Sequence, residues 1–228
     1  MEIGKAFTYV FEDPKWIMKV LIGGIVGIIP IVNFAALGFM LTTLKNVAEG
    51  QPTPMPEWSD FGAHFMKGLY GVIGALVYFL PAIVVFCCVF IVGIAATTLA
   101  SSGSKDAAQA AGGIVPILTI CLQCVGYLLE LVAFLALWAP MTRFAMSANQ
   151  LNLFWDFKGN MDFIKSNLSN YFISLALSFV ATFVAGFGII LCIVGVFFTY
   201  FWAYMVSANL WGQMWRASMG KGTMPAMA

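Results

Sequence analysis

The sequence predicts an all-α fold, a polytopic transmembrane helical bundle that forms a single integral membrane domain over residues 1–228. Hydrophobic residues make up 61% of the chain and charged residues only 9%, whereas soluble domains are about 45–50% apolar and about 25% charged. Long apolar runs occupy residues 16–44, 68–100, 113–142 and 171–215. Helices satisfy their own backbone hydrogen bonds in hydrocarbon, which open sheet edges do not. At about 20 residues per span, the length allows about six membrane helices and no soluble catalytic domain.

The last apolar run is too long for one helix. Gly186, Gly188 and Gly195 lie within the string AGFGIILCIVG, where glycine lowers helical propensity. We therefore expect two helices, at about residues 170–188 and 195–215, joined by a tight turn.

The first apolar run, residues 16–44, is interrupted by Pro30 and Asn33. It forms either one kinked span, giving five spans in all, or a shallow, re-entrant hairpin. Cytoplasmic loops collect Lys and Arg. A hairpin places ten Lys and Arg residues on one side of the membrane and only Lys105 on the other. A single span places four of them on one side and seven on the other. The ten are Lys5, Lys15, Lys19, Lys45, Lys67, Arg143, Lys158, Lys165, Arg216 and Lys221. The charge distribution thus favours the hairpin, with both termini in the cytoplasm.

Similar strings recur along the chain and predict three parallel hairpin repeats, each entered by a short interfacial helix. WIMK, HFMK and DFIK each end in a lysine at the start of an apolar run, and each follows or overlaps an aromatic and aspartate cluster. The expected repeats are residues 1–51, 52–151 and 152–228. Tryptophan prefers the membrane boundary, and five indoles fall near the predicted cytoplasmic boundary. They are Trp16, Trp58, Trp155, Trp211 and Trp215.

Three strings resemble the Domain of Unknown Function 4013 family. They are AFTYVFEDPKWIMKVLIGGIVGIIPIVNF, PEWSDF and ILCIVGVFFTYFWAYMVSANLWGQMWR, and the resemblance extends over nearly the whole chain. Members are small multi-span membrane proteins of bacteria and archaea. The resemblance implies a prokaryotic cytoplasmic membrane and supplies no activity, substrate or catalytic residue.

Glu130 is the main candidate for chemistry within the membrane. It lies near the middle of an apolar run, where a charge costs about 2.5–3.5 kcal/mol. Tyr127 lies on the same stripe and Gln123 on a neighbouring face. The functional interpretation is a proton or cation site. The structural one is a protonated carboxyl that is hydrogen-bonded to a neighbouring helix.

Small residues and an Asp-Pro pair indicate packing and helix starts. Close helix contacts are expected at Gly23, Gly27, Gly68, Gly71 and Gly74, because small residues let helix backbones approach. Asp13 and Pro14 are expected to cap a helix and to occupy its first position, respectively.

No metal site and no cofactor is predicted. The five cysteines lie in apolar runs, where a thiol packs as a small hydrophobe and stays unreactive. His64 is the single histidine. It could supply one axial ligand to haem or a chlorophyll-type pigment, but an aromatic neighbour at the membrane boundary is the favoured interpretation.

Two functional hypotheses remain. The chain lacks nucleotide-binding, metalloprotease and serine-hydrolase motifs, and its net charge of +1 without a basic cluster argues against nucleic acid. The first hypothesis is a non-enzymatic membrane protein that contacts other helices, as a homo-oligomer or an accessory subunit, with membrane lipids around it. The alternative is a channel or a transporter of ions or small solutes that uses Glu130.

Overall fold

The computed structural model describes residues 1–101, 105–190 and 194–220, and within these ranges the chain is helical without strands. This confirms the all-α fold class. The α-helices are α1 Ile3–Glu12, α2 Trp16–Ile28, α3 Phe34–Glu49, α4 Phe61–Ser101, α5 Lys105–Met146, α6 Phe157–Ser166, α7 Leu168–Gly186 and α8 Gly195–Met219. Short 3-10 turns are η1 Trp58–Asp60, η2 Leu151–Phe154 and η3 Phe187–Ile190.

The chain divides into two compact units. The core unit comprises residues 1–74 and 138–228, and the hairpin unit comprises residues 75–137. The hairpin unit therefore lies inside the second expected repeat, residues 52–151, and the unit boundaries do not follow the repeat boundaries.

Helix α8 is the centre of the core unit. It packs along α7 and also contacts α1, α2 and α3. Trp211 and Trp215 are its largest buried side chains. The Trp211 indole stacks on Trp138 at a centroid distance of 4.9 Å and meets Tyr171 edge-on. Burial of such large aromatic rings contributes strongly to core stability.

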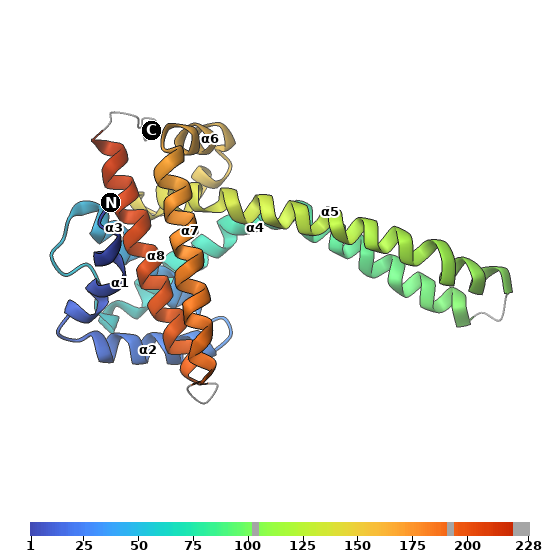
Figure 1. Ribbon diagram of the computed structural model, residues 1–228, viewed down its shortest axis with the longest axis horizontal. Coiled ribbons are helices and arrows are strands. Elements are labelled where there is room, and N and C mark those ends of the chain that lie inside the picture. Colours follow the sequence, from blue (N-terminus) through green and yellow to red (C-terminus); the bar gives the residue numbers. More distant parts are fainter. Residues whose placement is uncertain (102–104, 191–193, 221–228) are drawn as a thin grey trace. The chain divides into compact units, whose positions relative to one another are not determined.

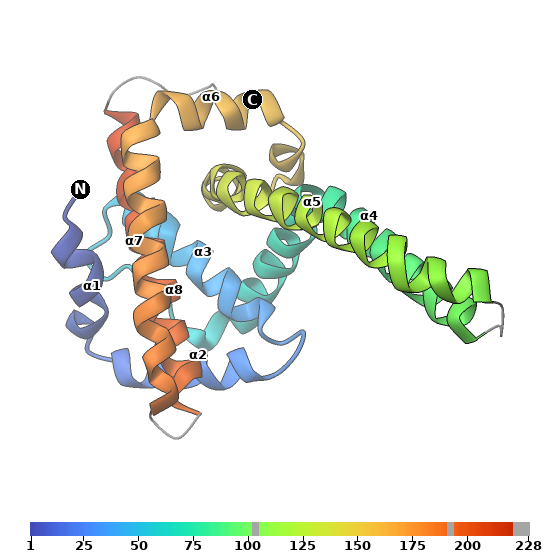
Figure 2. The same ribbon diagram turned by 45° about the vertical axis from the view of Figure 1, so that its right-hand side comes forward.

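The first apolar run forms two helices rather than one kinked span. α2 ends at Ile28 and α3 begins at Phe34. Between them Ile31 has a φ of 71°, a conformation that β-branched residues rarely adopt. At 13 residues, α2 is about 20 Å long and shorter than the hydrocarbon layer. It lies across the Gly195 end of α8 instead of alongside α7 and α8 (Figures 1 and 2).

The break expected in the last run is present, since α7 ends at Gly186 and α8 begins at Gly195. Helix α5 begins at Lys105, so it includes polar residues that precede the apolar run expected at 113–142. The sequence there is KDAAQAA, and alanine has the highest helical propensity.

Three helices, rather than six, are long and apolar enough to cross a membrane among the described residues. They are Trp58–Ser101, Gly112–Met146 and Leu168–Ile190. Helix α8 is not among them, and it carries Ser207, Asn209, Gln213 and Arg216. The arrangement of six spans in three parallel hairpins stays a prediction.

Candidate functional site

The hairpin unit presents a long apolar surface. Its two antiparallel segments, residues 75–101 of α4 and 105–137 of α5, lie side by side in Figures 1 and 2. They meet through small and aromatic residues. Ala82 and Ala133 are buried, and Phe86 lies against Gly126 and Tyr127.

Most large hydrophobic side chains of the hairpin unit point away from this seam. Phe90 is 71% exposed, Ile114 is 73% exposed and Leu128 is 63% exposed. Monomeric soluble proteins rarely expose apolar patches of this extent, so such a surface marks contact with lipid or with another protein. We call this surface, formed by the exposed apolar side chains of residues 75–137, the hairpin surface.

Glu130, Gln123 and Tyr127 are brought together on the hairpin surface. Their spacing of four and three residues places all three on one stripe of α5, so Gln123 does not lie on the neighbouring face expected from the sequence. Glu130 and Tyr127 are exposed and Gln123 is half-buried. Within the described part of the chain, the Glu130 carboxylate has no hydrogen bond and no ion pair. It therefore does not face the interior of its own chain, as an internal packing role would require.

The cysteines also lie on this surface. Cys87, Cys88, Cys121 and Cys124 are free and exposed, and Cys192 lies outside the described residues. Packing inside the chain, the favoured explanation from the sequence, does not account for these four thiols, because all four are exposed. No group of three or more metal-ligating side chains occurs among the described residues.

Four of the five predicted packing glycines lie against another element. Gly23 lies against the Phe201 ring of α8, Gly71 against Leu41 of α3, and Gly74 against the Phe154 ring. Gly68 meets α3 at Gly38, backbone against backbone. Gly27 differs, because nothing lies within 4 Å of the position of a Cβ there.

A buried ion pair joins the FEDPKW and PEWSDF strings. Lys19 is 4% exposed, and its Nζ lies 2.8 Å from Asp13 Oδ2, 3.2 Å from Glu57 Oε1 and 2.9 Å from the Met55 carbonyl oxygen. The Trp58 indole N–H donates to the Lys19 carbonyl oxygen at 3.0 Å. The hydrogen bond from Lys19 lowers the pKa of the Glu57 carboxyl. These contacts fix the segment after α3 onto the start of α2.

Asp13 and Pro14 lie in the turn before α2, which begins at Trp16, so Pro14 is not its first helical residue. The Asp13 carboxylate accepts the Lys15 backbone N–H at 2.8 Å. It thus stabilises the turn, as Asp side chains do by bonding the backbone two residues on.

A second buried cation anchors α6. Arg143 donates to Asp156 Oδ2 at 2.8 Å and to Asn160 Oδ1 at 2.6 Å. Asp156 caps α6 by accepting the Gly159 N–H at 2.9 Å. This bond, together with the one from Arg143, lowers the pKa of the Asp156 carboxyl.

His64 is buried rather than exposed at a boundary. Its Nε2 lies 3.0 Å from the Glu57 carbonyl oxygen, and its ring contacts Phe39 and Trp58. The ring is therefore held by neighbours of its own chain.

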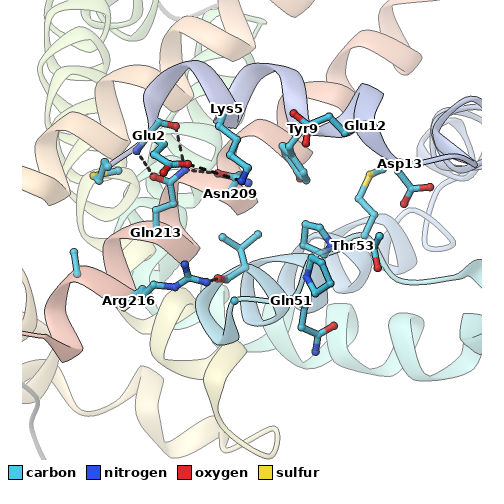
Figure 3. A pocket seen from close by; sticks show the side chains of 17 residues that line it. Glu2, Lys5, Tyr9, Glu12, Asp13, Gln51, Thr53, Asn209, Gln213 and Arg216 are labelled. Atoms are coloured by element: carbon cyan, nitrogen blue, oxygen red, sulfur yellow. Dashed lines mark hydrogen bonds and ion pairs between the residues drawn. The ribbon is translucent and has the colours of Figure 1, made fainter.

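A polar cavity of about 540 Å³ lies between α1, α8 and the segment Gly50–Met55. Figure 3 shows Lys5 and Arg216 toward one end and Glu12 and Asp13 toward the other. The Gln213 side-chain amide donates to the Glu2 carbonyl oxygen at 3.2 Å, which links α8 to the residue before α1, and to Asn209 Oδ1 of α8 at 2.6 Å. A lining with both signs of charge and several amides suits a small polar molecule.

Among the lining residues, the sequence indicated a structural role only for Asp13, while Lys5 and Arg216 contributed only to the charge distribution. Asn209, Gln213 and Arg216 recur four and three residues apart on α8, so they form one polar stripe on a helix. That spacing could have indicated the polar cavity. The pairing of Asp13 with Lys19 has no such signal, because a turn separates the two residues.

The comparisons with known proteins add one finding. Neither the comparison with curated proteins nor that with solved structures gave a significant match. The comparison with protein families matches residues 22–194 to the family described as "Protein of unknown function (DUF4013)". The matched range begins after FEDPKW and ends before α8, so it is shorter than the near-complete resemblance expected from the sequence. It covers well over half of the 228 residues, and the chain therefore belongs to the DUF4013 family.

Proposed function

We propose that this chain is a non-enzymatic component of a prokaryotic cytoplasmic membrane that works by helix contact, as a homo-oligomer or as an accessory subunit. The observation that carries the proposal is the hairpin surface with Glu130 exposed on it. Two helices that meet along one seam leave their outer faces for lipid or for another protein. The multi-pass arrangement with both termini in the cytoplasm belongs to the same proposal.

Glu130 argues for a protein partner in addition to lipid. A carboxyl group that faces hydrocarbon costs about 2.5–3.5 kcal/mol on insertion scales. A hydrogen bond across a helix interface reduces that cost and contributes about 1–2 kcal/mol in model helices. Gln123 and Tyr127 lie on the same stripe, so a second copy would offer both donors and acceptors to Glu130.

Native mass measurement in a mild detergent tests this proposal. We expect wild-type particles heavier than the 24.8 kDa monomer, either as multiples of that mass or with another subunit. Glu130→Gln keeps the hydrogen-bonding capacity and should keep the assembly, whereas Glu130→Leu should weaken it. Particles of monomer mass for the wild type, at every detergent concentration that keeps the chain folded, would contradict the proposal.

The alternative, a channel or transporter that uses Glu130, predicts a different response to the same variants. A proton or cation site needs the ionisable carboxyl, so Glu130→Gln would abolish flux into vesicles while the assembly stayed intact. The polar cavity contains none of Glu130, Gln123 and Tyr127. This favours the contact role. Flux that Glu130→Gln removes would favour transport instead.

A further inference from the structure

A second cavity, of about 400 Å³, lies between α2, α3, α4 and α8 within the core unit. We call it the apolar cavity. We propose that it binds one acyl chain of a membrane lipid. This inference rests on the membrane placement in the proposed function, because only there are lipid chains the surrounding solvent.

The walls of the apolar cavity suit hydrocarbon. Phe34, Leu37, Val72 and Phe197 contribute apolar side chains from three helices. The volume falls within the range of about 300–1,000 Å³ that is typical of small-molecule sites.

Two glycines of α2 shape the cavity differently. At Gly23 the position of a Cβ is occupied by the Phe201 ring, so α2 and α8 are in close contact there. One helical turn later, at Gly27, nothing lies within 4 Å of that position. Because Gly27 has no side chain, the space beside it belongs to the cavity.

Three polar groups line the same cavity. The side chains of Asn33, Tyr200 and Tyr204 are exposed, and they make no hydrogen bond within the described residues. Tyrosine prefers sites where its ring has apolar surroundings and its hydroxyl contacts water. Apolar walls with hydrogen-bonding groups at exposed positions match an amphiphile, that is, a hydrocarbon chain with an ester or headgroup at one end.

Photolabelling tests the occupant. The full chain would be reconstituted in phospholipid vesicles that contain a phospholipid with a diazirine on one acyl chain. After irradiation, the labelled peptides would be located by mass spectrometry. We expect labels on Val72 and on residues 196–204, in addition to labels over the hairpin surface.

Gly27→Leu fills the cavity and should abolish the label at Val72 and residues 196–204. Gly62→Leu is the matched control, because Gly62 also has nothing within 4 Å of a Cβ and lines neither cavity. It should keep the wild-type pattern. Val72→Phe narrows the cavity from α4 and provides a second variant if Gly27→Leu fails to fold.

The outcomes separate this inference from the proposed function. Labels on the hairpin surface without labels at the cavity would overturn the acyl-chain site and leave the membrane placement standing. Labels at neither place would overturn both. A bound molecule whose mass, measured on the native particle, matches no phospholipid would also contradict the acyl-chain site.

Discussion

Buried cations of the core unit bind carboxylate and carbonyl oxygens of its loops, and Lys19 is the clearest example. It contacts Asp13, Glu57 and the Met55 carbonyl oxygen from an almost fully buried position. Its four-carbon stem reaches these acceptors from α2, and the ammonium group has three donors to satisfy them. Removal of this side chain would leave the buried Asp13 carboxylate without a counter-ion.

We therefore expect Lys19→Met to destabilise the protein by about 3–5 kcal/mol, the usual cost of breaking a buried ion pair by removing one partner. Thermal unfolding in detergent, followed by helical circular dichroism, measures the effect. Lys15→Met is the matched control. The Lys15 side chain is 66% exposed and lies 3.4 Å from Glu57, so its removal should cost less than about 1 kcal/mol. Equal effects of the two variants would contradict a structural role for the buried pair.

Asp156 gives the core unit a defined response to acid. Its folded-state pKa lies below the ordinary value of 3.8 because Gly159 and Arg143 donate to the carboxylate. A lowered folded-state pKa means that the stabilisation is complete above the unfolded value and is lost as the pH falls through the folded value.

The unfolding temperature of the wild type should therefore fall as the pH drops from above 3.8 to below it. Asp156→Asn should be less stable at neutral pH and should lose less on acidification. Asp162→Asn, on the exposed face of the same helix, should keep the wild-type profile. A pH profile of Asp156→Asn that is parallel to the wild type would rule out this contribution.

Some of these residues could be predicted from the sequence and others could not. Asp156 lies within the aromatic WDF string and caps α6, a role that depends on local spacing and can therefore be read from a sequence. The burial of Lys19 and Arg143 was not foreseen. Their partners lie across turns, and a single chain gives no local signal for such contacts.

Among the helices, apolar runs and glycine or proline breaks were sufficient to locate most elements. The pair α7 and α8 was expected from such a break. The break at Pro30 and Asn33 left one kinked span as an alternative, and the charge distribution favoured the pair α2 and α3. The orientation of α2 across the end of α8 was not, because hydropathy reports the length of a segment and not its direction. Hydropathy also does not indicate the start of α5 at Lys105, because this segment is polar, although its alanines favour helix.

Backbone contact between α3 and α4 depends on glycine. A Cβ at Gly68 would collide with the Phe34 carbonyl oxygen, and one at Gly38 would collide with the His64 carbonyl oxygen. Backbone atoms cannot rotate away as side chains do, so the helices themselves would have to separate. Gly38 was missed by the sequence analysis, because an isolated glycine in a helix carries no spacing signal.

Gly68→Ala should therefore destabilise the core unit by about 1–3 kcal/mol, the usual cost of overpacking. Gly62→Ala, in the first turn of the same helix, meets nothing within 4 Å and should stabilise it by up to about 1 kcal/mol through helical propensity. Comparison of the two unfolding temperatures measures the difference. Stabilisation by both substitutions would show that α3 and α4 do not touch at this point.

In the molecule as a whole, the two units differ in how much of their apolar surface is buried. The core unit buries Trp211 and Trp215 of α8, and the buried cations Lys19 and Arg143 form ion pairs at its loops. The hairpin unit has only a seam of small and aromatic residues, and most of its large apolar side chains are exposed. A single chain does not reveal what covers such a surface. For that reason the sequence could predict the apolar helices but not whether lipid, a second copy or another subunit lies against them.

The last prediction for the whole molecule concerns which side of the membrane each loop lies on. Ten of the eleven Lys and Arg residues fall on one side if both termini lie there, with Lys105 opposite. In a variant without the native cysteines, Gln109→Cys should react with a membrane-impermeant maleimide added to intact cells. Lys158→Cys on α6 should react only after the cells are opened, because a cation-rich loop stays in the cytoplasm. Gln109 and Lys158 are both exposed in the structure. A cysteine at either position that fails to react is therefore shielded by the membrane and not by burial in the protein. Reaction of both cysteines in intact cells would contradict the predicted topology, and the hairpin surface would then require a different placement in the bilayer.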